Sequence, residues 1–144
     1  MDSFQPTLTP EQMLTMGVFG GNYFANATDR DFDGIRPSIV NLARQDNRTF
    51  DVKNNYYGVK AGKSYQWWAD RGWIFDEDPL GWFQWYCRYS SGRRHERDEH
   101  QIDRHKRYVL RWGNNAINQG KRKGKVSPVV LQGLLQWGMT GYDV

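Results

Sequence analysis

The sequence predicts a mainly α-helical fold: a single compact domain with an aromatic-rich core and at most a small β-hairpin. Its 144 residues suit one domain of ordinary size, which buries roughly 68–70% of its unfolded surface. Only 38% of the residues are hydrophobic, but 15% are Phe, Trp or Tyr, so a few large rings can fill a core. Helix-starting and helix-ending residues recur along the chain without an internal repeat. We therefore expect one domain over residues 1–144.

The first helix is predicted over residues 9–17. Thr9 is a favourable N-cap, Pro10 suits the first helical position, and Gln12 completes a capping box. Gly17 then ends the helix.

Turns and one more short helix are expected in the rest of the N-terminal half. Gly20 and Gly21 predict a tight turn, and residues 29–34 predict a loop. A helix over residues 37–43 begins at a proline and carries apolar side chains for burial. Residues 49–62 hold β-prone side chains around an Asn-Asn pair, which is compatible with a small hairpin.

The middle of the chain predicts two helices, the second being the strongest in the sequence. The first covers residues 64–71. The second starts with Asp78 as N-cap and Pro79 at its first position, and Gly92 ends it. Acidic residues near its start suit the positive end of the helix dipole.

The C-terminal third is predicted as helix, loop and helix. Residues 93–111 form a long helical candidate, and residues 113–126 are polar and basic and predict a loop. Ser127 and Pro128 then begin an apolar helix that Gly138 ends.

A single cysteine, Cys87, excludes a disulfide within the chain and favours a reducing compartment. The chain opens without a secretory signal pattern, and no apolar run approaches 18 residues. We expect a cytoplasmic protein with no membrane partner.

The positive charge is concentrated between Arg93 and Lys125, where eleven Lys or Arg face four Asp or Glu. Arginine predominates, and its planar guanidinium matches phosphate oxygens and stacks on rings. This pattern predicts binding of nucleic acid or another phosphorylated ligand. The expected phosphate-binding residues are Arg88, Arg93, Arg94, Arg97, Arg104, Lys121, Arg122 and Lys123.

On the predicted helix around residue 85, Trp82, Trp85 and Tyr89 lie on one face, because side chains three and four apart are neighbours. They are candidates for an aromatic pocket beside the arginines. The competing interpretation is structural: the rings fill the core while the arginines pair with carboxylates or lie near the helix C-terminus.

Three residues are candidates for catalysis: Asp98 and Gln101, which share a helix face with Arg104, and the lone thiol of Cys87. A structural ion-pair network and a buried, unreactive cysteine are the alternatives. The three histidines are spaced five apart, which does not bring two of them onto one helix face, so we expect no metal and no cofactor.

The segments "GVFGGNYF", "RGWIFDEDPLGWFQWYCRYSSGRR" and "DEHQIDRH" resemble a group of small proteins from phages, microbes, fungi and algae. The pattern of that group runs GVFGGxY and then DPxGWFQWYCRYxxGRRxxxDxxQIxR, and the resemblance covers the chain from Met13 to about His105. It implies relatives without a mechanism, because no activity is established for the group. By position, the motif falls on Gly20, Gly21, Trp82, Gln84, Trp85, Cys87, Arg88, Gly92, Arg93, Arg94, Asp98, Gln101 and Arg104. The group usually carries Trp where this chain has His105, which argues against a metal or catalytic role for that histidine.

The leading functional hypothesis is therefore nucleic-acid or phosphate binding through an arginine- and aromatic-rich helical face. A nucleotide- or base-modifying enzyme that uses the same pocket is one alternative. A structural or assembly protein, whose arginines form ion pairs between subunits, is the other. The sequence leaves the oligomeric state open.

Overall fold

The computed structural model describes residues 4, 6–45, 53, 55–59, 61 and 65–140 of the chain. Regular structure within these residues is helical, and the mainly α fold class is confirmed. The one β pairing there is an isolated bridge between Phe75 and Asp78. Half of the residues 49–62, where a hairpin was expected, lie outside the described residues, and the described half holds no strand. The elements are α1 (Pro10–Thr15), the short 3-10 helix η1 (Asp29–Phe32), α2 (Pro37–Ala43), α3 (Tyr65–Asp70), α4 (Trp82–Ser90), α5 (Asp98–Lys123) and α6 (Pro128–Leu135).

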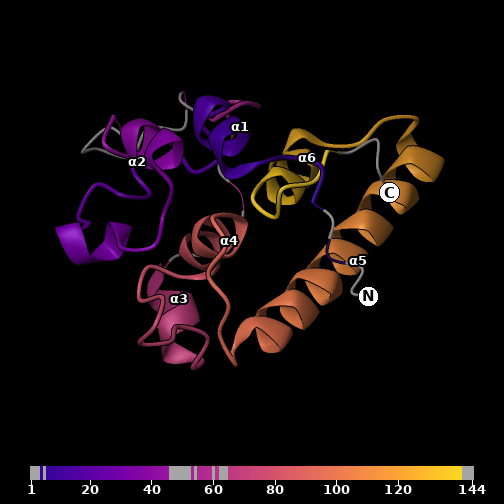
Figure 1. Ribbon diagram of the computed structural model, residues 1–144. Helices are drawn as coiled ribbons and strands as arrows, with labels where there is room; N and C mark the ends of the chain where they lie inside the picture. Colours follow the sequence, from indigo (N-terminus) through magenta and orange to yellow (C-terminus); the bar gives the residue numbers. More distant parts are fainter. Residues whose placement is uncertain are drawn as a thin grey trace.

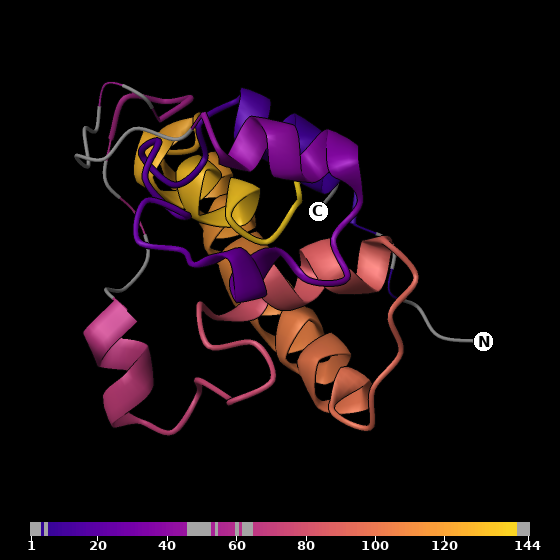
Figure 2. The ribbon, with the colours of Figure 1, turned by 60° about the vertical axis from the view of Figure 1, so that its left-hand side comes forward.

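Helix α4 lies at the centre of the molecule, and every residue from Trp82 to Arg88 is buried. Helices α1 and α2 pack together on one side of it, and α5 runs along the other side (Figure 1). Helix α6 packs against the C-terminal half of α5, as both views show (Figures 1 and 2). A single helix of nine residues therefore organises the packing of several others.

Helices α1, α2 and α6 begin where the sequence predicts, whereas α1 ends at Thr15 and α6 at Leu135, shortly before the glycines expected to end them. The Thr9 hydroxyl accepts the Gln12 N–H at 3.2 Å, and the Gln12 side chain accepts the Thr9 N–H at 2.8 Å, which completes the capping box. Helix α2 begins at Pro37, and Ser127 caps α6 through the Val130 N–H. The expected cap of α3, Ser64, lies outside the described residues.

The start of α4 differs from the prediction, because the helix begins at Trp82 rather than at Pro79. Gly81 has a φ of 115°, which a non-glycine residue rarely adopts, so the chain turns sharply there. The Gln84 side chain accepts the Leu80 N–H at 2.8 Å and fixes this turn. Asp78 is left outside the helix and is free for another role.

The basic segment 113–126, expected as a loop, is helical as far as Lys123, and α5 starts at Asp98 rather than at Arg93. The segment packs one side on α6 through Trp112 and Ala116. Gly124, with φ of 72°, then ends the helix in the left-handed conformation. The lysines and arginine just before Gly124 suit the negative end of the helix dipole, so the basic run is a helix C-terminus.

Candidate functional site

Arg88 lies in the last turn of α4 and is buried, with 7% of its surface exposed. Its guanidinium donates to the backbone carbonyls of Arg30, Asp33 and Glu77 and to the Asp78 carboxylate, 3.0 Å away. Two of these acceptors belong to residues 30–33 and two to residues 77–78, so Arg88 joins two separate segments to α4. Its donors are used inside the protein and are not presented to a partner.

Arg93 completes this network. It forms a bidentate pair with Asp78, with nitrogen–oxygen distances of 2.9 and 2.8 Å. The Asp78 side chain is fully buried between the two guanidinium groups. Nε of Arg93 has no hydrogen-bond partner among the described residues. Arg88 and Arg93 thus converge as expected, but on a carboxylate of the chain itself.

Arg94 and Arg97 lie in the connection between α4 and α5, and each lies over an aromatic ring. Arg94 is 3.9 Å from the Tyr89 ring centre, and Arg97 is 4.0 Å from that of Phe75. Nε of Arg97 also donates to Glu77 at 2.8 Å. Arg94 is exposed and has no ion pair among the described residues, whereas Arg97 is half-buried and paired.

Arg104 is enclosed by indole rings. Its guanidinium lies 4.8 Å from the ring centre of Trp68, 5.1 Å from that of Trp73 and 5.8 Å from that of Trp137. One nitrogen donates to the Trp73 carbonyl at 3.0 Å, and no carboxylate in the described part of the chain pairs with it. Burial lowers the pKa of Arg104 to about 10. The rings therefore enclose an arginine of the protein and leave no space for a ligand base.

The expected aromatic pocket is filled. Trp82 stacks on His105 with ring centres 5.2 Å apart, and Phe4 packs edge-on against Trp85 and Tyr89. These rings belong to the main hydrophobic core together with residues of α1, α2 and α6. They stabilise the fold rather than line a cavity.

Cys87 is fully buried, and this burial raises the pKa of its thiol well above the ordinary value. A nucleophilic cysteine needs the opposite shift and access to substrate. The position of Cys87 is that of a small core residue.

Asp98 and Gln101 face α4, as their shared helix face predicted, and both join the two helices. The Asp98 carboxylate accepts the Trp85 indole N–H at 2.8 Å and the His95 backbone N–H at 2.9 Å. The backbone carbonyl of Gln101 accepts the Trp82 indole N–H at 3.1 Å, and the side-chain oxygen of Gln101 accepts from Arg104 at 3.5 Å. The polar atoms of this cluster are engaged in joining α4 to the first turn of α5.

Besides Arg94, a separate set of exposed cations lies on the C-terminal two thirds of α5. Its exposed cations form what we call the α5 basic face, and they are Lys106, Arg107, Arg111, Lys121 and Arg122. Arg107 pairs with Asp103 across one helical turn at 2.9 Å, and the other four have no ion pair within the part of the chain that the structure describes. The sequence holds no acidic residue between Asp103 and Asp143, so Asp103 is the last carboxylate along α5.

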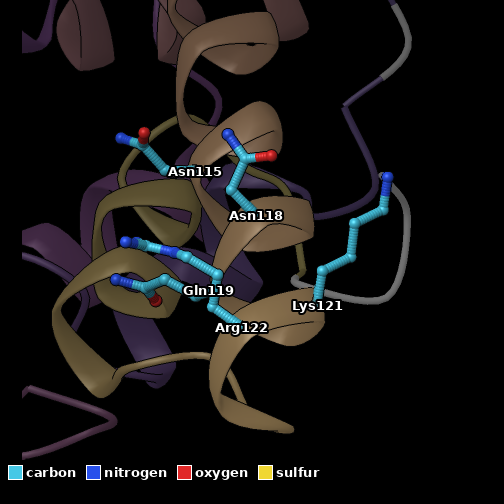
Figure 3. Close-up of a pocket in the computed structure, with 5 residues that line it drawn as sticks. All are labelled: Asn115, Asn118, Gln119, Lys121 and Arg122. Atoms are coloured by element: carbon cyan, nitrogen blue, oxygen red, sulfur yellow. The ribbon is translucent and has the colours of Figure 1, made fainter.

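An open surface hollow of about 490 Å³ lies over the end of this face. Asn115, Asn118, Gln119, Lys121 and Arg122 line it, and Figure 3 shows the Asn115 and Arg122 side chains extending to one side of α5 and Lys121 to the other. Of the predicted phosphate-binding residues, Lys121 and Arg122 are therefore accessible together. The Lys123 side chain lies outside the described part of the structure.

The site residues expected from the sequence do not include Lys106, Arg107, Arg111, Asn115 or Asn118. For Asn115 and Asn118 the signal is the helical spacing of exposed polar residues past residue 111, which the loop expected over residues 113–126 did not take into account.

No protein-family model, no curated protein and no solved structure matches the chain. Among the described residues, no group of three or more His, Cys, Asp or Glu is placed to hold a metal ion. No described helix is long and apolar enough to cross a membrane.

Proposed function

We propose that the chain binds nucleic acid through the α5 basic face. The observation that supports this proposal is an exposed helical surface with five cations and one compensating carboxylate, Asp103, at its edge. Cations that neutralise phosphates release bound counterions, which supplies affinity without any sequence requirement.

The proposed partner, nucleic acid, is the one expected from the sequence. The proposed binding surface is the α5 basic face and not the arginines around α4. Arg88, Arg93 and Arg104 are committed to the interior, so they position α4 and α5 rather than contact the partner. Lys121 and Arg122 remain, and Arg107 and Arg111 join them along the helix.

Binding is tested with a fluorescently labelled duplex of mixed sequence, about 20 base pairs long, titrated with the protein at several salt concentrations. If five phosphates are neutralised, the association constant falls by a factor of about 500 between 50 and 200 mM salt. Binding that does not change with salt, or no binding at 50 mM, would contradict the proposal.

A pair of variants with equal net charge locates the surface. Arg111→Gln with Lys121→Gln removes two cations from the α5 basic face. Arg30→Gln with Arg44→Gln removes two exposed cations from the region of η1 and α2, which α4 separates from α5 in Figure 1. We expect the first pair to weaken binding much more than the second, with both variants retaining the helical circular dichroism of the parent. Equal losses would show a general charge effect without a defined face.

Self-association is a second candidate function, favoured by two apolar side chains on the outside of α5. Leu110 is 61% exposed and Ile117 is 44% exposed, and they lie seven residues apart on one side of the helix. Light scattering after size exclusion at several protein concentrations tests it. A dimer that Leu110→Gln with Ile117→Gln converts to a monomer would support this function, and a monomer in the parent protein would exclude it.

The structure provides no comparable support for the enzyme hypothesis. Its candidates Cys87, Asp98 and Gln101 are held within the packing of α4 and α5.

A further inference from the structure

Four side chains of α5 form a single polar line, which we call the α5 stripe: Arg111, Asn115, Asn118 and Arg122. Their spacing of four, three and four residues places them along one side of the helix. All four are exposed, and none forms an ion pair or a side-chain hydrogen bond within the described residues. Neighbouring Gln119 differs, because its side-chain oxygen accepts the Ser127 N–H at 2.8 Å and holds the connection to α6.

The chemistry of the stripe matches the edges of bases. A guanidinium forms two parallel hydrogen bonds with O6 and N7 of guanine, and the amide of asparagine does so with N6 and N7 of adenine. A need for polar surface does not explain why asparagine stands at positions 115 and 118. Asparagine is a poor helix former, and Lys, Glu or Ala would favour the helix at exposed positions. The two asparagines stand in the last third of a 26-residue helix that their intrinsic preference opposes.

The surroundings of the stripe match the backbone of a duplex. Arg107 and Lys121 lie on an adjacent side of α5, where they can reach phosphates while the stripe faces the groove floor. Trp112 and Ala116 pack on α6 from a different face of α5, so they leave the stripe uncovered.

The dimensions select one form of duplex. An α-helix with its side chains is about 10–12 Å wide, and the major groove of B-form DNA is about 12 Å wide. The major groove of A-form RNA is too deep and narrow for side chains to read. From Arg111 to Arg122 the helix rises about 16 Å, which spans roughly five base pairs.

From these observations we infer that α5 lies in the major groove of double-stranded DNA and that the α5 stripe recognises a short sequence containing both guanine and adenine. This inference rests on the proposed nucleic-acid binding and adds the duplex form, the groove and the residues that select the sequence.

The test is selection from a pool of DNA duplexes with a randomised central segment, using the full chain. We expect enrichment of one short motif, which the protein then binds at least tenfold more tightly than a scrambled duplex. In the same titrations, Asn115→Ala and Asn118→Ala should each lower that preference about tenfold, while binding to the scrambled duplex and its salt dependence stay unchanged. Lys121→Gln should instead weaken both duplexes equally. Asn41→Ala, the same change at an exposed position of α2, is the matched control and should alter neither.

The outcomes separate this inference from the proposal beneath it. Salt-dependent duplex binding without an enriched motif, or an enriched motif that both asparagine variants retain, would overturn the inference and leave the proposed function in place. Binding to single strands or to RNA duplexes alone would overturn the inference as well. Absence of binding to every nucleic acid at 50 mM salt would overturn both.

Discussion

Asp78 is placed by the tertiary structure in a role that its local sequence does not indicate. In the chain it precedes a proline and matches a helix N-cap, yet its carboxylate is buried between Arg88 and Arg93. The two arginines follow it by ten and fifteen residues, so the pairing depends on the turn at Gly81 that brings α4 back over the loop. A buried charge of this kind is costly to leave unpaired.

We therefore expect Asp78→Asn to destabilise the protein by about 3–5 kcal/mol, because two guanidinium groups lose their counterion in the interior. Urea unfolding measures the change in the free energy of unfolding. Asp103→Asn is the control, since its pair with Arg107 is exposed and such pairs contribute about 0–1 kcal/mol. Similar losses in the two variants would contradict the structural role of Asp78.

His105 is buried in the core, where it takes the place of an aromatic side chain. Its Nε2 donates to the Trp137 carbonyl at 2.8 Å, and its ring stacks on Trp82. Burial lowers the pKa of His105 from 6.5 to about 4. Between these values the unfolded chain binds a proton that the folded protein does not, so acid favours unfolding.

The free energy of unfolding should therefore fall by about 3 kcal/mol, from this residue alone, as the pH drops from 7 to 4. His105→Phe should be less stable at pH 7, because the Trp137 carbonyl loses its donor, but should lose less stability on acidification. Urea unfolding at pH 7 and pH 4.5 checks this, because Glu11, with its pKa lowered from 4.5 to about 2 by Arg36, loses its stabilising effect mainly below pH 4.5 and does so in both proteins. An equal decline in both proteins would contradict the assignment.

At the scale of elements, the helices with complete local signals could be predicted and the others could not. Thr9, Pro37 and Ser127 mark their helices with caps and prolines whose partners lie within one turn. The start of α4 depends instead on Tyr23, whose hydroxyl donates to the Leu80 carbonyl at 2.8 Å and accepts the Gln84 N–H at 3.1 Å. That contact joins residues far apart in the chain, so no local pattern contains it.

The C-terminal half of α5 was mistaken for a loop because its inward face is made of small side chains. Gly113 and Ala116 are buried there, and they give almost no hydrophobic signal among the basic and amide residues. Helix α6 supplies the apolar surface that stabilises this half, and only the folded arrangement shows it.

Glycine substitutions test the extended helix. Gly120 is helical, and a Cβ there would meet no atom within 4 Å, so Gly120→Ala should stabilise the protein by about 0.5–1 kcal/mol. Gly133→Ala, in α6, should destabilise it by about 1–3 kcal/mol, because the new Cβ would lie 2.9 Å from the Trp112 ring. Thermal and urea unfolding measure both. Destabilisation by Gly120→Ala would indicate that the segment is not helical.

For the whole molecule, the sequence shows that arginine is abundant but not how the arginines divide between interior and surface. Arg88, Arg93 and Arg104 resemble surface arginines in the chain, but carbonyls, a carboxylate and indole rings from distant segments enclose them. Their polar neighbours Asp98 and Gln101 likewise join α4 to α5. These polar side chains around α4 therefore have a structural explanation, and the exposed cations of the α5 basic face lie beyond them.

The most direct test of nucleic-acid binding by α5 is a nuclear magnetic resonance titration of the isotopically labelled protein with a DNA duplex. The account predicts that the largest shifts of backbone amide signals fall between Lys106 and Lys125, with small shifts in α1 and α2. Largest shifts around Arg88, Arg93 and Arg104, or shifts spread evenly over the molecule, would contradict it.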